Sequence, residues 1–239
     1  MEGSTTGDRP APAAEADALR PAMLGDQIKD RLLTMIMEGE LPPGTRIVET
    51  RIARELGASQ APVREALRDL AQLGFVELQP YKGARVRRHT VEEHIEAIEV
   101  RAELEAMAAR EVAGKLTGAQ LAQMRAVNDE MRRLIAEGDV HGHALKNTEF
   151  HSLIVQASSN RTLRRIWEMV QPFAQTYYTV SVAGAVPGAY DEDRHLPILE
   201  ALIEGDPERA GEVMREHGRA NVALLRDAQR KQQSGDVVE

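Results

Sequence analysis

Four side chains in the second half of the chain have the types and spacing of a metal-binding site. Asn147 and His151 are four residues apart, so on a helix they share one face and aim at one point. His195 opens a later predicted helix, and His217 lies inside the last one. Antiparallel helices can bring such residues together in a bundle core. There, three imidazoles and one oxygen donor suit a divalent transition metal, zinc or nickel, better than a hard cation.

Each of these histidines also has an ordinary structural interpretation. A single helical histidine is more often hydrogen-bonded or partly exposed than bound to a metal, so the spacing alone leaves both interpretations open. His89, His94, His141 and His143 lie near predicted linkers or helix ends and are left out of the predicted site.

A second stretch has the character of a DNA-reading helix. Residues 59–70 place apolar side chains on one arc and polar or small ones on the other, which predicts a helix that packs on a core with one face free. The apolar arc consists of Val63, Ala66, Leu67, Leu70 and Leu73. The free face, which could contact DNA, consists of Gln60, Ala61, Arg64 and Arg68.

Two helices are predicted before this one. Residues 24–38 repeat apolar side chains at helical spacing and stop at the glycine and proline residues of 39–44. Residues 49–56 form a second, short helix, and Gly57-Ala58 is the tight break found between the two helices of a helix-turn-helix. The helix that begins at Ser59 is then the recognition helix.

A hairpin is predicted after the recognition helix. Apolar and polar residues alternate at 75–78 and 84–87 around the turn residues 80–83, which indicates the wing of a winged helix-turn-helix. The side chains and amides expected to contact the DNA backbone or minor groove are those of Thr50, Arg51, Ser59, Lys82, Gly83 and Arg85.

Within the recognition helix, Arg64 is the strongest candidate for a base contact, because it lies one turn after Gln60 on the helix that would enter the major groove. Arg68 could equally be an ordinary solvated charge. Ser59 is a helix cap in either case, and its hydroxyl or the adjacent amides could also meet a phosphate.

Beyond residue 88 the sequence predicts only helices. Thr90 caps a long helix to about Leu116, and Thr117 with Gln120 forms a capping box for the next helix. Further helices are predicted at 140–157, 161–182, 191–204 and 207–229. Asn160 is expected to cap a helix rather than to bind a ligand.

The predicted fold class is therefore mainly α. A winged helix-turn-helix domain spans residues 24–88, and an all-α antiparallel bundle of six or seven helices spans residues 89–232. Residues 1–23 form a disordered tail, and residues 233–239 a flexible C-terminus.

Composition and charge limit the possible functions. The formal net charge is −8, but residues 24–89 carry 11 Lys and Arg against 9 Asp and Glu, whereas residues 90–239 carry 17 against 25. A modestly basic head on an acidic body is compatible with DNA binding through a local patch. The chain has no cysteine, which excludes disulfides and thiolate metal sites. No apolar run approaches the roughly 20 residues that cross a bilayer, and no signal peptide is evident, so we expect a cytoplasmic protein.

The head resembles the winged helix-turn-helix of the GntR family of bacterial transcription regulators. The resemblance is carried by Leu41-Pro42-Pro43-Gly44, by residues 52–57, by Ser59-Gln60-Ala61-Pro62-Val63-Arg64-Glu65-Ala66-Leu67, by residues 73–76 and by Gly83-Ala84-Arg85-Val86. Many relatives have Arg where this chain has Gln60. Because Gln can pair bidentately with adenine, the base facing Gln60 need not be the family's usual one.

Residues 90–230 resemble the effector-binding domain of the FadR subfamily, in its metal-binding branch. The segments that resemble it are residues 147–151, 157–160, 195–202 and 205–217. In that branch an Asp and three His hold a metal, and their positions correspond to Asn147, His151, His195 and His217. Asn147 brings no charge, so a bound ion would be held more weakly and would attract an anionic effector more strongly.

The resemblance also implies a small organic acid as effector. Arg101 corresponds to an Arg that faces the pocket, where it would grip a carboxylate by a two-point contact. Its alternative role is an ion pair with Glu105 or Glu99 on the same helix. Tyr177 and Tyr178 could line the same cavity, although aromatic residues in a helix are more often core.

Taken together, these features predict a homodimeric transcription regulator, most simply a repressor, that binds a near-palindromic double-stranded operator and answers to a small carboxylate. We expect it not to be an enzyme. Two alternatives remain: a metalloenzyme that uses the three histidines to activate water, and a winged-helix adaptor whose bundle serves only for dimerisation.

Overall fold

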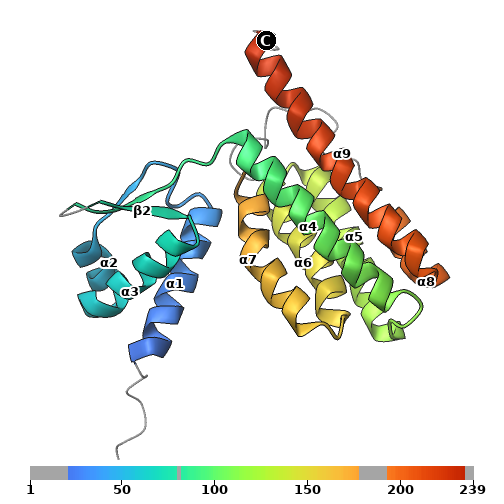
Figure 1. Cartoon of the computed structure of the whole chain (residues 1–239), viewed down its shortest axis with the longest axis horizontal. Helices are drawn as coiled ribbons and strands as arrows, with labels where there is room; N and C mark the ends of the chain where they lie inside the picture. The colour runs from blue at the N-terminus through green and yellow to red at the C-terminus, as the bar shows by residue number, and fades with distance from the viewer. Residues whose placement is uncertain (1–20, 80–81, 178–192, 235–239) are drawn as a thin grey trace, which may run out of the picture.

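The computed structural model describes residues 21–79, 82–177 and 193–234, which form a small mixed head and a larger helical bundle (Figure 1). The predicted tail up to residue 20, the helix beyond Tyr177 including Tyr178, and residues 235–239 lie outside the described residues. The prediction that the fold is mainly α is confirmed.

The head is a winged helix-turn-helix. Its elements are α1 (Pro21–Met37), β1 (Arg46–Ile47), α2 (Glu49–Glu55), α3 (Gln60–Gln72), β2 (Val76–Gln79) and β3 (Gly83–Val86). The three strands form an antiparallel sheet in the order β1-β3-β2, with Arg46 opposite Arg85 and Val76 opposite Val86. The sequence did not predict β1, because two residues are too few to show an alternating pattern. Four of the five residues of the predicted apolar arc of α3 are fully buried, and Leu73 packs at the edge of the same core.

Ser59 differs from its prediction as a side-chain cap. It occupies the N-cap position of α3 with extended backbone, but its hydroxyl makes no capping hydrogen bond. A cap oxygen normally accepts from the amide of the second or third helical residue, and the third residue here is Pro62, which has no N–H. The Ser59 hydroxyl therefore remains exposed at the start of α3.

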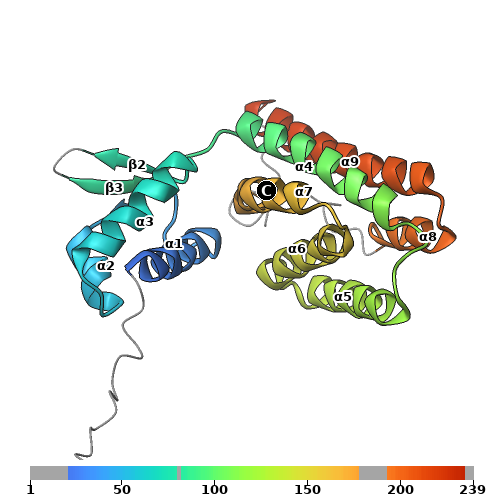
Figure 2. The ribbon, with the colours of Figure 1, turned by 60° about the horizontal axis from the view of Figure 1, so that its bottom comes forward.

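The bundle consists, within the described residues, of α4 (Val91–Val112), α5 (Gly118–Glu137), α6 (Val140–Ala157), α7 (Arg161–Tyr177), α8 (Leu196–Glu204) and α9 (Pro207–Ser234). Figure 2 shows α4 beside α9 and α5 beside α6, with α7 between the two pairs. Helix α4 packs on α9, α7 and α6, so it forms the centre of the domain. None of the described helices is both long enough and apolar enough to cross a membrane.

Most predicted helix starts in the bundle are confirmed by their hydrogen bonds. Thr90 and Thr117 each form a complete capping box, with Glu93 and Gln120 respectively. Asn160 Oδ1 accepts from the amide of Leu163 at the start of α7, as expected of a cap.

Three predicted helix boundaries in the bundle were wrong, and one of them is the end of α9, which continues to Ser234 rather than stopping at residue 229. Helix α4 ends at Val112 rather than near Leu116, because Ala113 is extended and Gly114 has a φ of +69°. Helix α8 begins at Leu196 rather than at residue 191, because residues 193–195 form a turn and Pro197 lies at the start of the helix, where proline is well tolerated.

The head contacts the bundle through the end of α7. The ring of Phe173 stacks on Phe75 of the head, with 4.2 Å between ring centroids. The Nδ1 atom of His94, in the first turn of α4, lies 2.8 Å from the carbonyl oxygen of Phe173. Arg87, at the end of the wing, pairs with Glu93 of α4. The covalent link between β3 and α4 lies beside these contacts. The head is therefore joined to the bundle at one junction, through this link and through the end of α7.

We expect Gly218→Ala to loosen the α4–α9 contact. A Cβ atom at Gly218 would lie 2.4 Å from the Cβ of Ala102, so one helix would have to shift. Such overpacking lowers the free energy of unfolding by about 1–3 kcal/mol, measurable by urea denaturation.

The matched control is Gly118→Ala, because nothing lies within 4 Å of a Cβ at that position in the first turn of α5. It should leave stability unchanged or raise it by roughly 0.4–1 kcal/mol. Equal stability of the two variants would show that the α4–α9 contact is not close at Gly218.

Candidate functional site

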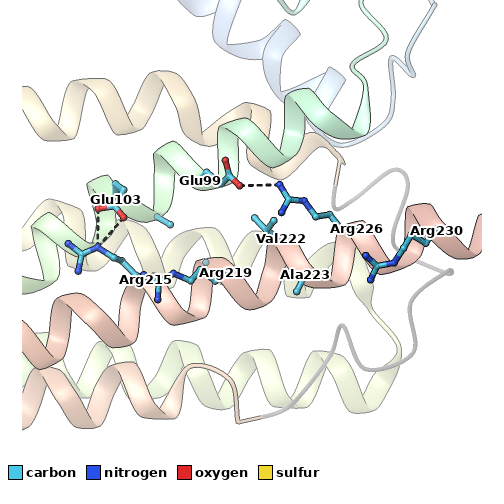
Figure 3. A pocket seen from close by; sticks show the side chains of 10 residues that line it. Glu99, Glu103, Arg215, Arg219, Val222, Ala223, Arg226 and Arg230 are labelled. Atoms are coloured by element: carbon cyan, nitrogen blue, oxygen red, sulfur yellow. Dashed lines mark hydrogen bonds and ion pairs between the residues drawn. The ribbon is translucent and has the colours of Figure 1, made fainter.

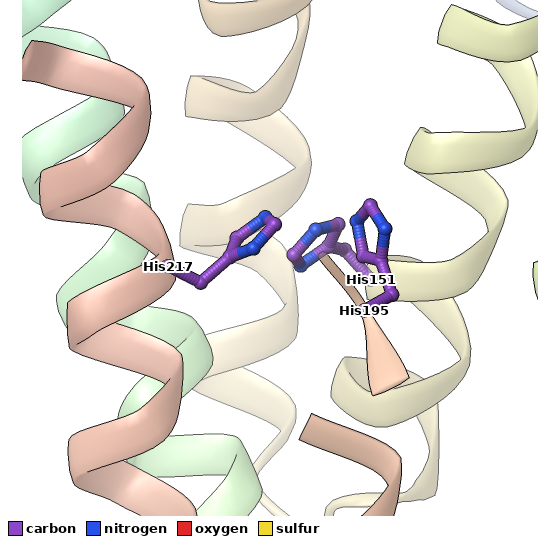
Figure 4. A group of neighbouring side chains, drawn as sticks. All are labelled: His151, His195 and His217. Atoms are coloured by element: carbon purple, nitrogen blue, oxygen red, sulfur yellow. The ribbon is translucent and has the colours of Figure 1, made fainter. Parts of the chain in front are cut away.

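Three histidines from three elements meet inside the bundle (Figure 4). His151 projects from the middle of α6, His195 from the N-cap of α8 and His217 from α9. Their ring centroids lie 4.6–5.4 Å apart, and one possible ligand nitrogen from each lies within 4.8 Å of the others. All three are buried, with exposed fractions of 0%, 6% and 9%.

The three rings present free nitrogen atoms to one another. The Nε2 atoms of His151, His195 and His217 are buried and have no hydrogen-bond partner among the described residues. Burial lowers the pKa of His195 and of His217 well below the usual value, and the neighbouring imidazoles lower both further. A transition metal binds imidazole through an unprotonated ring nitrogen, and the lowered pKa of His195 and of His217 favours that form, so the three residues fit a metal.

Glu105 on α4 orients the first of these rings. Its Oε2 atom lies 3.0 Å from Nδ1 of His151, and its Oε1 atom accepts a 2.8 Å hydrogen bond from Nε1 of Trp167 on α7. Arg101, one turn earlier on α4, places its Nε 3.2 Å from the same Oε1. Burial favours the protonated carboxyl, but the charge of Arg101 and the contacts with His151 and Trp167 lower the pKa of Glu105 to about 2. A carboxylate this close to Nδ1 favours the tautomer of His151 with its proton on Nδ1, which would leave Nε2 for the cluster.

A second candidate site lies on the head. Helix α3, the start of α2 and the wing enclose an open groove of about 590 Å³. Its lining includes six residues that the sequence predicts to contact DNA, namely Thr50, Gln60, Arg64, Arg68, Lys82 and Gly83. It also includes Arg46 and Glu49, which the sequence did not single out.

The remaining predicted DNA contacts lie outside the groove lining but on the same exposed parts of the head. Ser59 and Ala61 stand at the exposed start of α3. The Nε of Arg51 lies 2.7 Å from Oε1 of Glu55 along α2, and Arg85 on β3 donates to the carbonyl oxygen of Gly44.

Comparison with known proteins identifies the two parts of the chain. Residues 24–86 match the bacterial regulatory proteins of the gntR family, and residues 96–220 match the FCD domain. The chain belongs to the GntR family. It is a DNA-binding transcription regulator with an FCD domain, as the sequence predicted.

Relatives of this GntR-family chain are named as transcriptional repressors or regulators. It is 32% identical over 204 residues to a protein of Paenarthrobacter nicotinovorans named a probable D-xylose utilization operon transcriptional repressor, covering 85% of this chain and 89% of the relative. It is 27% identical to the HTH-type transcriptional regulator McbR of Escherichia coli, over 83% and 91% of the two chains.

Solved structures confirm the fold of this GntR-family chain. The structure of E. coli McbR/YncC has a TM-score of 0.75 at 24% identity, with 85% of this chain and 97% of that chain covered. A regulator from Rhodococcus sp. RHA1 gives a TM-score of 0.72 at 23% identity, with 85% and 98% covered.

Arg101 and Asn147, which the sequence also predicts for the pocket, lie on α4 and α6, the helices that carry Glu105 and His151. Arg101 is buried and forms the ion pair with Glu105 that was its alternative role, while Glu99 faces Arg226 instead. Asn147 is partly buried on α6, one turn before His151. The side chain of Tyr177 and all of Tyr178 lie outside the described residues.

His143 was set aside because it lies near a helix start, yet it belongs to the surroundings of the cluster. It is buried in the first turn of α6, and burial together with Arg194 lowers its pKa to about 4. It also contributes to the lowered pKa of His195. The sequence could have suggested this placement, because His143 is eight residues, about two helical turns, before His151.

We expect the double variant His195→Ala/His217→Ala to lose most of its bound metal after zinc loading and desalting, as measured by elemental analysis. Glu105→Gln should keep the three ligands but lower zinc affinity roughly 10- to 100-fold in a chelator competition, because it removes the carboxylate that orients His151. Circular dichroism should confirm that both variants are folded.

His141→Ala is the matched control, because it removes an imidazole from the same helix as His151 but outside the close group. Its metal content should equal that of the wild type. Full metal retention in the double variant would place the ligands elsewhere.

Proposed function

We propose that this regulator is a repressor that releases its operator when a small organic acid binds in the bundle. The observation that carries the proposal is the meeting of three buried histidines, His151, His195 and His217, with the positive charge of Arg101. The P. nicotinovorans relative is named a repressor, and a relative in Bacillus licheniformis is named a gluconate operon repressor. Gluconate is itself a small carboxylate, which supports this class of effector.

In this proposal His151, His195 and His217 hold a divalent transition metal, zinc before nickel, and Asn147 offers an amide oxygen from the same face of α6. A bound metal would supply a Lewis acid for a carboxylate oxygen. Arg101 adds a fixed positive charge beside it, since that charge contributes to the lowered pKa of His217. Both features favour an anionic ligand over a neutral one.

We infer that the site senses its ligand rather than converts it. The acidic group nearest to the cluster is Glu105, whose pKa of about 2 leaves it without a proton to donate near neutral pH. Its oxygens are engaged by Arg101, His151 and Trp167. A general acid or base needs a pKa closer to the working pH, so the enzyme alternative is weaker.

We propose residues 24–88 as the DNA-binding domain and 89–232 as the effector and dimerisation domain. Val100 and Met107 lie two turns apart on α4 and are 50% and 49% exposed, which supports contact with a second copy of the chain. Helices α4 and α9 also enclose a groove of about 490 Å³ lined by Glu99, Glu103 and four arginines of α9 (Figure 3). A two-fold symmetric dimer would bind a near-palindromic operator.

Helix α7 offers a route from the bundle interior to the head. Trp167 binds Glu105, which orients His151, and Gln171 donates a 2.9 Å hydrogen bond to Thr148 of α6. Two residues further on, Phe173 stacks on Phe75 of the head. A ligand that displaces His151 or Glu105 would therefore shift the helix end on which the head rests.

We expect Arg64→Ala to weaken operator binding by about 1–3 kcal/mol in a gel-shift titration, because Arg64 lies in the groove on the recognition helix. The bundle should keep its stability. Arg125→Ala, which removes the same charge from an exposed position of α5, is the control and should bind like the wild type. Equal affinities of the two variants would contradict the recognition-helix assignment.

We expect gluconate or another acid from a panel of small mono- and dicarboxylates to raise the melting temperature of the zinc-loaded protein and to release it from the operator. Arg101→Lys should reduce the affinity for the acid, because lysine keeps the charge but loses the planar fork. Phe173→Ala should still bind the acid but release DNA poorly.

The neutral sugar D-xylose is the control ligand. Binding of D-xylose with no response to any acid would reject the carboxylate proposal, and normal DNA release by Phe173→Ala would reject the α7 route.

A further inference from the structure

Glu49 is an acidic residue inside the surface that approaches DNA. It is the first residue of α2 and lines the groove between α2, α3 and the wing. Its Oε2 atom accepts two hydrogen bonds from Arg64, from Nε at 3.0 Å and from Nη2 at 2.9 Å. A carboxylate facing DNA repels phosphates, so its presence there requires an explanation beyond net charge.

The hydrogen bonds to Glu49 fix which edge of Arg64 faces outward. A guanidinium has five N–H donors in one plane, and Glu49 engages the edge formed by Nε and Nη2. The adjacent edge, formed by Nη1 and the second hydrogen of Nη2, keeps two parallel N–H groups. Two parallel donors match the N7 and O6 acceptors of guanine in the major groove.

Exposure of the two side chains agrees with this arrangement. The Glu49 side chain is 24% exposed and the Arg64 side chain 51%, so the arginine is the more accessible of the two to DNA. Arg68, one turn further along α3, has no acidic partner among the described residues and is free to follow a phosphate. Of these two arginines on α3, Arg64 is therefore fixed by an ion pair and Arg68 is not.

We propose that Glu49 is the positioning residue of Arg64, and that the pair reads a guanine at one base pair of each operator half-site. The proposal rests on the assignment of α3 as the recognition helix. It adds a base identity and a second residue to that assignment, because an arginine held by its inner edge loses less side-chain freedom when it binds a base.

The variant Glu49→Gln distinguishes the positioning of Arg64 from a simple repulsion between Glu49 and the DNA phosphates. If Glu49 acted only as a negative charge, Glu49→Gln would bind every DNA more tightly. If Glu49 positions Arg64, Glu49→Gln should bind the operator on the order of tenfold more weakly and lose preference at a single base pair.

Glu55→Gln is the matched control. It removes the same charge from the same helix, and Glu55 likewise pairs with an arginine, Arg51, at 2.7 Å. Because Arg51 lies outside the groove lining, this variant should keep the full sequence preference and bind DNA equally or slightly more tightly.

The experiment is selection of binding sites from random-sequence DNA by the full-length wild type, Glu49→Gln, Glu55→Gln and Arg64→Ala. Titrations of each variant on the selected site follow, together with versions changed at single base pairs. We expect the wild type and Glu55→Gln to select one guanine per half-site that both Glu49→Gln and Arg64→Ala no longer select. In the Arg64→Ala background, Glu49→Gln should cause no further loss, and thermal unfolding should confirm that each variant is folded.

Retention of that guanine by Glu49→Gln, with equal or higher affinity for all DNA, would overturn the positioning role. If Arg64→Ala also retained wild-type selection, the recognition-helix assignment would fail as well, so the two failures are distinguishable.

Discussion

The interior of the bundle depends on a single buried carboxylate. Glu105 is 2% exposed, and an ionised group at that depth is tolerated only when charged and hydrogen-bonding partners surround it. It draws those partners from its own helix and from two others: Arg101 from α4, His151 from α6 and Trp167 from α7. Any displacement of these helices would strand a charge in the core. Apolar packing brings the helices together, and Glu105 decides how they are aligned around the histidines.

The same carboxylate links the histidine cluster to the helix that contacts the head. The partner on α6 belongs to the histidine cluster, and the partner on α7 belongs to the helix that carries Phe173 to the head. Such an arrangement has few intermediate states, because a hydrogen bond to a buried charge is either made or lost at considerable cost. This property suits the proposed change between an operator-bound and an effector-bound state.

Local sequence patterns predicted most of the elements and only part of the site. The capping boxes at Thr90 and Thr117, the apolar arc of α3 and the hairpin residues are short-range signals, and the structure follows them. The meeting of His151 with Glu105 joins residues 46 positions apart and depends on how α4 and α6 cross, which no periodicity encodes. Similarly, Glu49 and Arg64 are 15 residues apart on two helices, so their pairing needs the turn between them. His195 opens α8 as predicted, but the start of that helix was placed too early, at residue 191, because a helical pattern in sequence does not reveal where a proline-containing start lies.

The recognition helix has no side-chain cap at its N-terminus, and Pro62 is the reason. Because it lacks an N–H at the third helical position, the Ser59 hydroxyl is not consumed by its own helix and stays at the surface as a donor. The helix start also concentrates partial positive charge from its unpaired amides. A DNA phosphate at this position would accept hydrogen bonds from the amides that the Ser59 side chain leaves uncapped. Binding of DNA would then raise the free energy of unfolding of the head, because the phosphate would act as the N-terminal cap that α3 lacks in the free protein.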